Sequence, residues 1–187
     1  DAGESGDVTV SEAVGDLGTG DILIDNAHTV VFSSTIDADN FTQTDGTNTT
    51  TMTGLYDLAG NFSFTGQTLT INGAGTNDAD GSMTVTNAGT FTTSNASLLD
   101  VGTEFVQNGT GTSTIGANIT SQADGIAFAT GVTLNGDADE VIEMKTEGGD
   151  GDDIVLSKTL QNTNGESITF DAGESGDVTV SEAVGDL

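Results

Sequence analysis

The chain of 187 residues has 30 Asp and Glu against two Lys and no Arg, for a formal net charge of −28. This balance excludes nucleic acid and anionic membrane surfaces as partners, because both are bound through clustered basic side chains, and the absence of Cys excludes disulfides and thiol chemistry. Hydrophobic residues make up 34% and are evenly spread, and the mean hydropathy of −0.12 indicates a folded chain.

Apolar residues fall two positions apart in short segments along the whole chain, which is typical of half-buried β-strands. In chain order, these pairs are Val8/Val10, Ile22/Ile24, Val30/Phe32, Phe62/Phe64, Leu69/Ile71, Met83/Val85, Ile126/Phe128, Val132/Leu134, Ile154/Leu156, Ile168/Phe170 and Val178/Val180. Only the segment from Asp139 to Lys145 is compatible with a short helix, and it alternates equally well. The pattern therefore predicts an all-β chain.

Turn-forming residues separate the predicted strands. Asn and Gly both tolerate the left-handed backbone conformation that a sharp corner can demand. Asn-Gly occurs at Asn72-Gly73, Asn108-Gly109, Asn135-Gly136 and Asn164-Gly165, and Asn-Ala takes the same place at Asn26-Ala27 and Asn87-Ala88. The sequence predicts an alternation of strand and corner.

The chain begins and ends with the same seventeen residues. Residues 1–17 and 171–187 both read DAGESGDVTVSEAVGDL. Identity over such a span is the signature of a tandem array. We therefore expect residues 1–170 to be one repeat and residues 171–187 to be the start of the next identical repeat.

Two folds are compatible with this pattern. A parallel β-solenoid is favoured because the 170-residue repeat is longer than a sandwich module of roughly 100 residues, Pro is absent and no linker separates the copies. At roughly 20 to 24 residues per coil, one repeat holds about seven or eight coils and adds about 35 to 40 Å to a rod. The alternative is an antiparallel β-sandwich adhesin module, because Asn-Gly is also a hairpin signal.

The pattern of strand and turn residues in this chain resembles a known class of repeat. The stretch from Gly20 to Thr50, followed by LTINGAGT at residues 69–76 and GSMTVTNAGTFTTSNASL at residues 81–98, resembles giant bacterial surface proteins of the filamentous-haemagglutinin-like and β-strand-repeat adhesin kind. The resemblance implies an exported, right-handed β-helical stalk at the bacterial cell surface. Its partners would be adjacent identical repeats, with carbohydrate or neighbouring cells as candidate ligands.

One segment suggests a metal site. Residues 148–156 read GGDGDDIVL, which matches the calcium-binding nonapeptide G-G-x-G-x-D-x-U-x. Calcium is therefore the only cofactor we consider, with Asp150, Asp152, Asp153, Asp137, Asp139 and Glu140 as candidate ligands. The alternative is a solvated acidic turn, and the same choice applies to the acidic turns at residues 37–40 and 77–81.

The sequence offers little for catalysis. His28 is the only His, and Lys145 and Lys158 are the only basic side chains, so we expect no enzyme. No apolar run approaches the roughly 18 residues of a membrane span, and we expect no membrane insertion by this segment. The predicted function is a structural repeat of an extracellular fibre or adhesin stalk. The alternative is a calcium-dependent binding module for carbohydrate or neighbouring cells.

Overall fold

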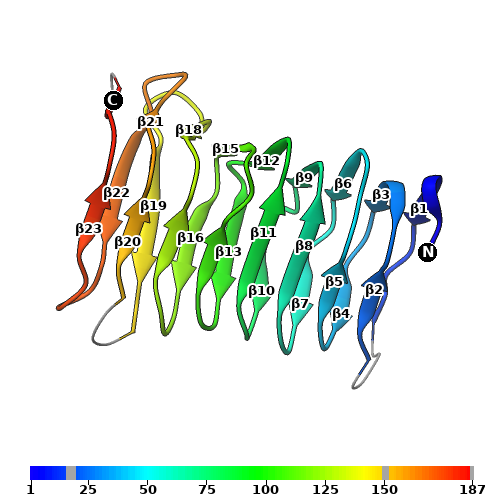
Figure 1. Ribbon diagram of the computed structural model, residues 1–187. Coiled ribbons are helices and arrows are strands. Elements are labelled where there is room, and N and C mark those ends of the chain that lie inside the picture. Colours follow the sequence, from blue (N-terminus) through cyan, green and yellow to red (C-terminus); the bar gives the residue numbers. More distant parts are fainter. Residues whose placement is uncertain (16–19, 149–151, 186–187) are drawn as a thin grey trace.

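The computed structural model describes residues 1–15, 20–148 and 152–185, and within these ranges the chain is a parallel β-solenoid. Three sheets run along a rod whose opposite ends hold the N and C termini (Figure 1). Every strand pairing in these ranges is parallel, so the predicted solenoid is confirmed and the alternative antiparallel β-sandwich is wrong. The described residues contain no helix, and hence none long and apolar enough to cross a membrane.

Each coil after the first contributes one described strand to each sheet in turn, and the first coil contributes described strands to sheets A and C only. Sheet A contains β1 (Gly3–Val10), β3 (Ala27–Phe32), β6 (Thr49–Met52), β9 (Thr68–Ile71), β12 (Thr90–Thr93), β15 (Thr112–Ile115), β18 (Val132–Leu134) and β21 (Leu160–Gln161). Sheet B contains β4 (Ile36–Ala38), β7 (Tyr56–Leu58), β10 (Gly75–Ala79), β13 (Ser97–Val101), β16 (Asn118–Ser121), β19 (Val141–Thr146) and β22 (Ser167–Asp171). Sheet C contains β2 (Ile22–Ile24), β5 (Phe41–Gln43), β8 (Phe62–Gly66), β11 (Met83–Asn87), β14 (Phe105–Gln107), β17 (Ile126–Phe128), β20 (Ile154–Leu156) and β23 (Val178–Val180).

The length of a coil varies along the rod. A short coil separates Thr50 from its partner Leu69, whereas a much longer one separates Ile126 from its partner Ile154. The additional residues lie in the corners, such as 135–140, because the strands themselves stay short. The eight described strands in each of sheets A and C agree with the predicted seven or eight coils. The segment that could have formed a helix, from Asp139 to Lys145, belongs largely to strand β19.

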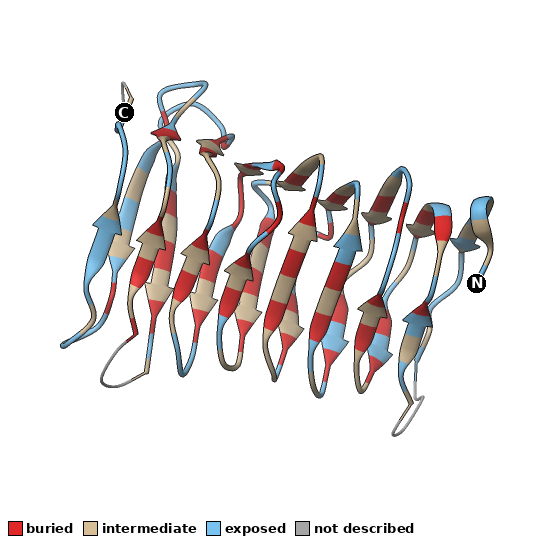
Figure 2. Cartoon of the chain, in the orientation of Figure 1, coloured by how far each residue is buried: buried red, intermediate tan, exposed pale blue. Residues whose placement is uncertain are grey.

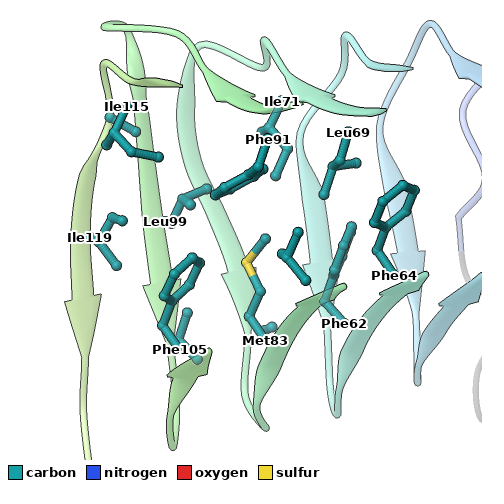
Figure 3. Close-up of a cluster of buried hydrophobic side chains, with 14 of the residues drawn as sticks. Phe62, Phe64, Leu69, Ile71, Met83, Phe91, Leu99, Phe105, Ile115 and Ile119 are labelled. Carbon is teal, nitrogen blue, oxygen red and sulfur yellow. The ribbon is translucent and has the colours of Figure 1, made fainter. Parts of the chain in front are cut away.

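The core consists of inward-facing side chains stacked on the same position of the next coil (Figure 3). In sheet C, Phe41, Phe62, Met83 and Phe105 follow one another in parallel register, and all four are buried. The Phe41 and Phe62 ring centroids lie 4.8 Å apart at an interplanar angle of 24°. Each buried side chain of this size contributes roughly 1.5–3 kcal/mol of transfer free energy, and the ladder repeats this along the rod.

Some inward positions hold polar side chains that the alternation did not reveal. Gln107 is fully buried after Phe105, and its Nε2 donates hydrogen bonds to Asn87 Oδ1 at 2.7 Å and to the Gly109 and Gly111 carbonyls. Asn87 in turn donates to the carbonyls of Gly89 and Thr112. Buried amides therefore connect the coils at the corner between sheets C and A, because each satisfies backbone groups that the corner leaves unpaired.

The predicted left-handed backbone explains one of the four Asn-Gly corners, and close packing explains others. Of the four Asn-Gly glycines, all of them described, only Gly165 has a left-handed backbone, with φ of 86°. At Gly109 the backbone is ordinary, but a Cβ would overlap the backbone of Asn87 in the preceding coil. Close stacking of successive corners, rather than backbone conformation, requires glycine there.

The core is enclosed along the rod and open at both ends. Strands in the middle of the rod alternate between buried and solvent-facing residues, whereas β23 at one end is mainly exposed (Figure 2). Several apolar side chains that pack on the core are only half-buried, and all belong to the two terminal coils. They are Ala2, Val8, Val10, Ile22, Ile168, Phe170 and Val180.

Candidate functional site: stacking ends and an aspartate ladder

The second copy of the duplicated sequence continues the stack. Val178 and Val180 pair in parallel register with Ile154 and Leu156, and Val184 forms a parallel bridge with Leu160. One edge of this copy is thus hydrogen-bonded to the preceding coil. The other edge faces away from the rod, and the Val178 and Val184 side chains remain 45% and 51% exposed.

The first copy uses its opposite edge. Val8 and Val10 pair with Val30 and Phe32 of the following coil, and Val14 forms a parallel bridge with Ile36. The same sequence therefore supports pairing on one side at the start of the chain and on the other side at the end. A strand with this sequence can be hydrogen-bonded along both edges at once.

The two copies share a left-handed glycine. Gly3 and Gly173 both have left-handed backbones, with φ of 72° and 67°. In each copy the glycine N–H donates to the side chain of the Asp two residues earlier, at 2.8 Å to Asp1 Oδ1 and 3.2 Å to Asp171 Oδ1. The backbone at this glycine and its hydrogen bond to the preceding Asp are therefore the same in both copies.

An aspartate ladder lies on the outer face of sheet B. Asp37, Asp57, Asp78 and Asp100 pair in direct register on four successive coils. Neighbouring strands are about 4.8 Å apart, so the carboxylates repel one another along the row. The pKa of Asp78 is raised above its ordinary value of 3.8, first by partial burial and then by the charges of its acidic neighbours, Asp100 foremost.

On the later coils, the row of residues that continues the aspartate ladder contains other side chains. Asp100 pairs with Thr120, which pairs with Lys145, which pairs with Asp171. Lys145 Nζ lies 2.6 Å from Glu147 Oε1, and this hydrogen bond raises the pKa of the Lys145 ammonium. Half of the sheet B face is thus strongly anionic, while the other half carries a cation.

The predicted calcium ligands lie at two corners. Asp137, Asp139 and Glu140 precede strand β19, and the Asp137 N–H donates to Glu140 Oε2 at 2.7 Å. Asp152 and Asp153 follow the same strand, at its other end. A strand of six residues spans about 20 Å, which separates the two acidic groups. The described residues contain no group of three or more His, Cys, Asp or Glu placed to hold a metal ion.

The nonapeptide segment is described only in part. Asp150 lies outside the described residues, so the calcium site at residues 148–156 stays a prediction. Asp152 is 2% exposed, its carbonyl accepts a hydrogen bond from Thr146 Oγ1, and its Oδ2 has no partner among the described residues. Asp153 Oδ1 accepts a hydrogen bond from the Asp177 N–H at 2.8 Å. Asp153 therefore joins the last two coils.

His28 does not form a proton relay. Its Nδ1 lies 3.2 Å from Asp7 Oδ1 and also 3.2 Å from Thr29 Oγ1. A nucleophile–base–acid chain needs the two partners on opposite ring nitrogens, whereas here both share one. The hydrogen bond to His28 lowers the pKa of the exposed Asp7 carboxyl. This arrangement links the first two coils at the surface.

A shallow open groove follows the corner between sheets C and A. It is lined by the corners of four successive coils, at residues 45–47, 65–67, 86–88 and 108–110. Its described lining consists of small, hydroxyl and amide side chains with one carboxylate, that of Asp45. The groove offers hydrogen-bonding groups along the rod axis.

Comparisons with family models, curated proteins and solved structures find no match for this chain. Its function is therefore inferred from the geometry of the solenoid. Sequence reasoning singled out the acidic turns at 37–40 and 77–81 but missed that Asp57 and Asp100 join Asp37 and Asp78 in one row. The signal was present, because these four residues are spaced by 20, 21 and 22 positions, close to one coil each.

Proposed function

We propose that the chain is a structural repeat of an extracellular or bacterial cell-surface fibre or adhesin stalk. In this stalk, identical repeats stack end to end into one continuous acidic solenoid. The observation that carries the proposal is the behaviour of the duplicated sequence, which pairs through one edge at Val178 and through the other edge at Val8. A repeat placed after this one would use both edges of the same strand.

The apolar ends support the same proposal. Val178 and Val184 are among the most exposed large apolar side chains, and both lie on the open edge of the last coil. Solenoid arrays need a polar cap where stacking stops, because an uncapped end exposes core side chains to water. A following repeat would cover these valines with residues that pair like Val30 and Ile36.

The charge of the chain suits a stalk. A net charge of −28 on one repeat disfavours lateral association of exposed strands and keeps neighbouring rods apart. The proposed partners are adjacent identical repeats, and the proposal includes export to the cell surface and no catalytic activity. Its mechanical basis is the continuous set of backbone ladders around an apolar core.

The proposal is tested by the unfolding of a chain that contains two consecutive repeats. We expect one cooperative transition at a higher temperature than that of a single repeat, because the seam adds stacked coils. Replacing Val178 with Asp at the seam is expected to split the transition. The matched Val141→Asp variant changes a 55% exposed valine that lies outside the core in the preceding coil, and it is expected to leave the transition single. Two independent transitions in the unmodified chain would contradict the proposal.

A second candidate function is a calcium-dependent binding module. It is favoured by the aspartate ladder, whose crowded carboxylates would be relieved by bound cations, and by the polar groove that could receive a carbohydrate chain. Calcium titration of the single repeat by calorimetry distinguishes this candidate. Saturable binding that is lost on Asp57→Asn substitution would support it, and heat that vanishes at moderate sodium chloride would contradict it.

A further inference from the structure

The two copies of the duplicated sequence occupy different sheets of the solenoid. Strand β1 of the first copy lies in sheet A, whereas β23 of the second copy lies in sheet C. Val14 bridges to β4 of sheet B, and its duplicate Val184 bridges to β21 of sheet A. Both pairs of equivalent residues therefore show that the second copy is shifted by one sheet relative to the first.

Because of this shift by one sheet, a repeat does not contain a whole number of coils. Starting from β1, the described chain returns to sheet A seven times, at β3, β6, β9, β12, β15, β18 and β21. It then passes through sheet B at β22 and reaches sheet C at β23. The chain from Val8 to its duplicate Val178 therefore makes seven full coils and two sides of an eighth.

We propose that each repeat is rotated by one third of a turn about the rod axis relative to the repeat before it. Equivalent faces then point in three directions and realign after three repeats. This inference rests on the proposed end-to-end stacking. The occupant of each open end is an adjacent copy of the same repeat.

Stacking tolerates such a rotation because it is local. Each strand pairs only with the strands one coil before and after it, so a repeat makes the same contacts whichever sheet it starts in. The duplicated glycine supports this point directly. Gly3 and Gly173 keep the same left-handed backbone and the same hydrogen bond to Asp1 and Asp171, although Gly3 begins strand β1 of sheet A and Gly173 lies in the turn before strand β23 of sheet C.

The rotation determines how the rod presents its surface. The aspartate ladder, Asp37 to Asp100, lies on one face in this repeat and would lie on each of the other two faces in the next two repeats. At roughly 4.8 Å per coil, the ladder would recur on any one side about every 110 Å. The rod would then have no single anionic side, and a ligand of the ladder would be displayed all around it.

The test uses a chain of three repeats with one cysteine in each, introduced as Asp124→Cys at an exposed corner of a protein that has no other cysteine. Gold labels attached to the thiols are located by cryo-electron microscopy. We expect three labels spaced by about 37 Å along the rod and rotated by a third of a turn from one to the next.

Labels aligned along one side of an intact rod would overturn the rotation while leaving the stalk in place. Separate globules without a rod would overturn the proposed function as well. The unlabelled three-repeat chain, reconstructed by the same method, gives the rotation independently if the label disturbs folding. A variant lacking residues 88–109, which make up one complete coil, serves as the control, because its labels should keep the rotation and move about 4.8 Å closer.

Discussion

Val8 and Val178 occupy the same position in two identical sequences, yet Val8 pairs in sheet A with Val30 and Val178 pairs in sheet C with Ile154. Each valine uses the edge that the other leaves unpaired. This relationship is the basis of both proposals, the end-to-end stacking and the rotation between repeats. The stacked coils are held together by side-chain interactions whose removal has predictable effects.

The Asp78→Asn substitution is expected to stabilise the protein at neutral pH. Each like-charged neighbour across the ladder costs roughly 0.2–1 kcal/mol, so removing the Asp78 charge is expected to raise the free energy of unfolding by about 0.5–1 kcal/mol at low salt. Thermal unfolding in low and high sodium chloride measures the change. The Asp124→Asn control, which makes the same charge change away from the ladder, is expected to have a smaller effect.

The stabilisation by Asp78→Asn is also expected to depend on pH. Because the pKa of Asp78 is raised in the folded protein, the folded state retains its proton while the unfolded state loses it. The Asp78 contribution to stability therefore falls as pH rises from the ordinary pKa of 3.8 to the raised value, and stays lower above it. The gain from Asp78→Asn should shrink below pH 3.8, and an equal gain at every pH would contradict this account.

The Gly109→Ala substitution is expected to destabilise the protein by about 1–3 kcal/mol, because a Cβ at this corner would overlap the backbone of Asn87 one coil earlier. The stacked corners would have to separate to make room for it. The matched Gly15→Ala variant places its Cβ in open space and is expected to be neutral. Chemical denaturation of both variants measures the difference, and equal stabilities would refute the packing argument.

The Gln107→Leu substitution is expected to cost about 1–3 kcal/mol despite its apolar surroundings, because it leaves buried polar atoms without partners. Asn87 Oδ1 would lose its donor, and Thr130 Oγ1 would lose one of its two acceptors, Gln107 Oε1 at 3.1 Å. The Gln122→Leu control removes an exposed hydrogen bond to Asp100 and is expected to change stability by less than about 0.5 kcal/mol. Urea denaturation separates the two, and a neutral Gln107→Leu variant would show that the amide is dispensable.

The Glu166→Gln substitution is expected to destabilise the corner between β21 and β22 by about 1–2 kcal/mol at pH 7. Glu166 is fully buried, and burial alone would raise its pKa, but hydrogen bonds from the backbone N–H groups of Asn164 and Thr163 outweigh it and lower the pKa. The Glu166 contribution is therefore present above the ordinary value of 4.5 and lost as pH falls through the lowered value. The exposed Glu104→Gln control should be neutral, and a matching loss there would contradict the prediction.

The sequence predicted those strands of the solenoid whose inward positions are both apolar, such as Phe62 and Phe64 in β8. It did not predict strands such as β10, whose inward residues are Asn77 and Ala79. Alternation of apolar residues does not reveal a buried amide side chain. Asn77 is accommodated by hydrogen bonds from its Nδ2 to the Gly73 and Gly75 carbonyls, which exist only after the corner has formed. Hydrophobic periodicity therefore could not predict the inward positions that hold polar side chains.

The candidate site was likewise predicted from the sequence only in part. The duplicated ends were evident from identity alone, and the acidic turns containing Asp37 and Asp78 were recognised as motifs. Their alignment into one ladder depends on coil lengths, which vary with the corner residues and become known only when the register is known. The one-sheet displacement between the copies likewise required the register of every intervening coil.

The most direct test of continuous stacking is the length of rods made from one, two and three repeats, measured by small-angle X-ray scattering and electron microscopy. Seven full coils and two sides at roughly 4.8 Å per coil predict that each added repeat lengthens a straight rod by about 37 Å at constant cross-section. Chains that bend at residues 171–187, or that grow as separate globules of unequal spacing, would contradict the account.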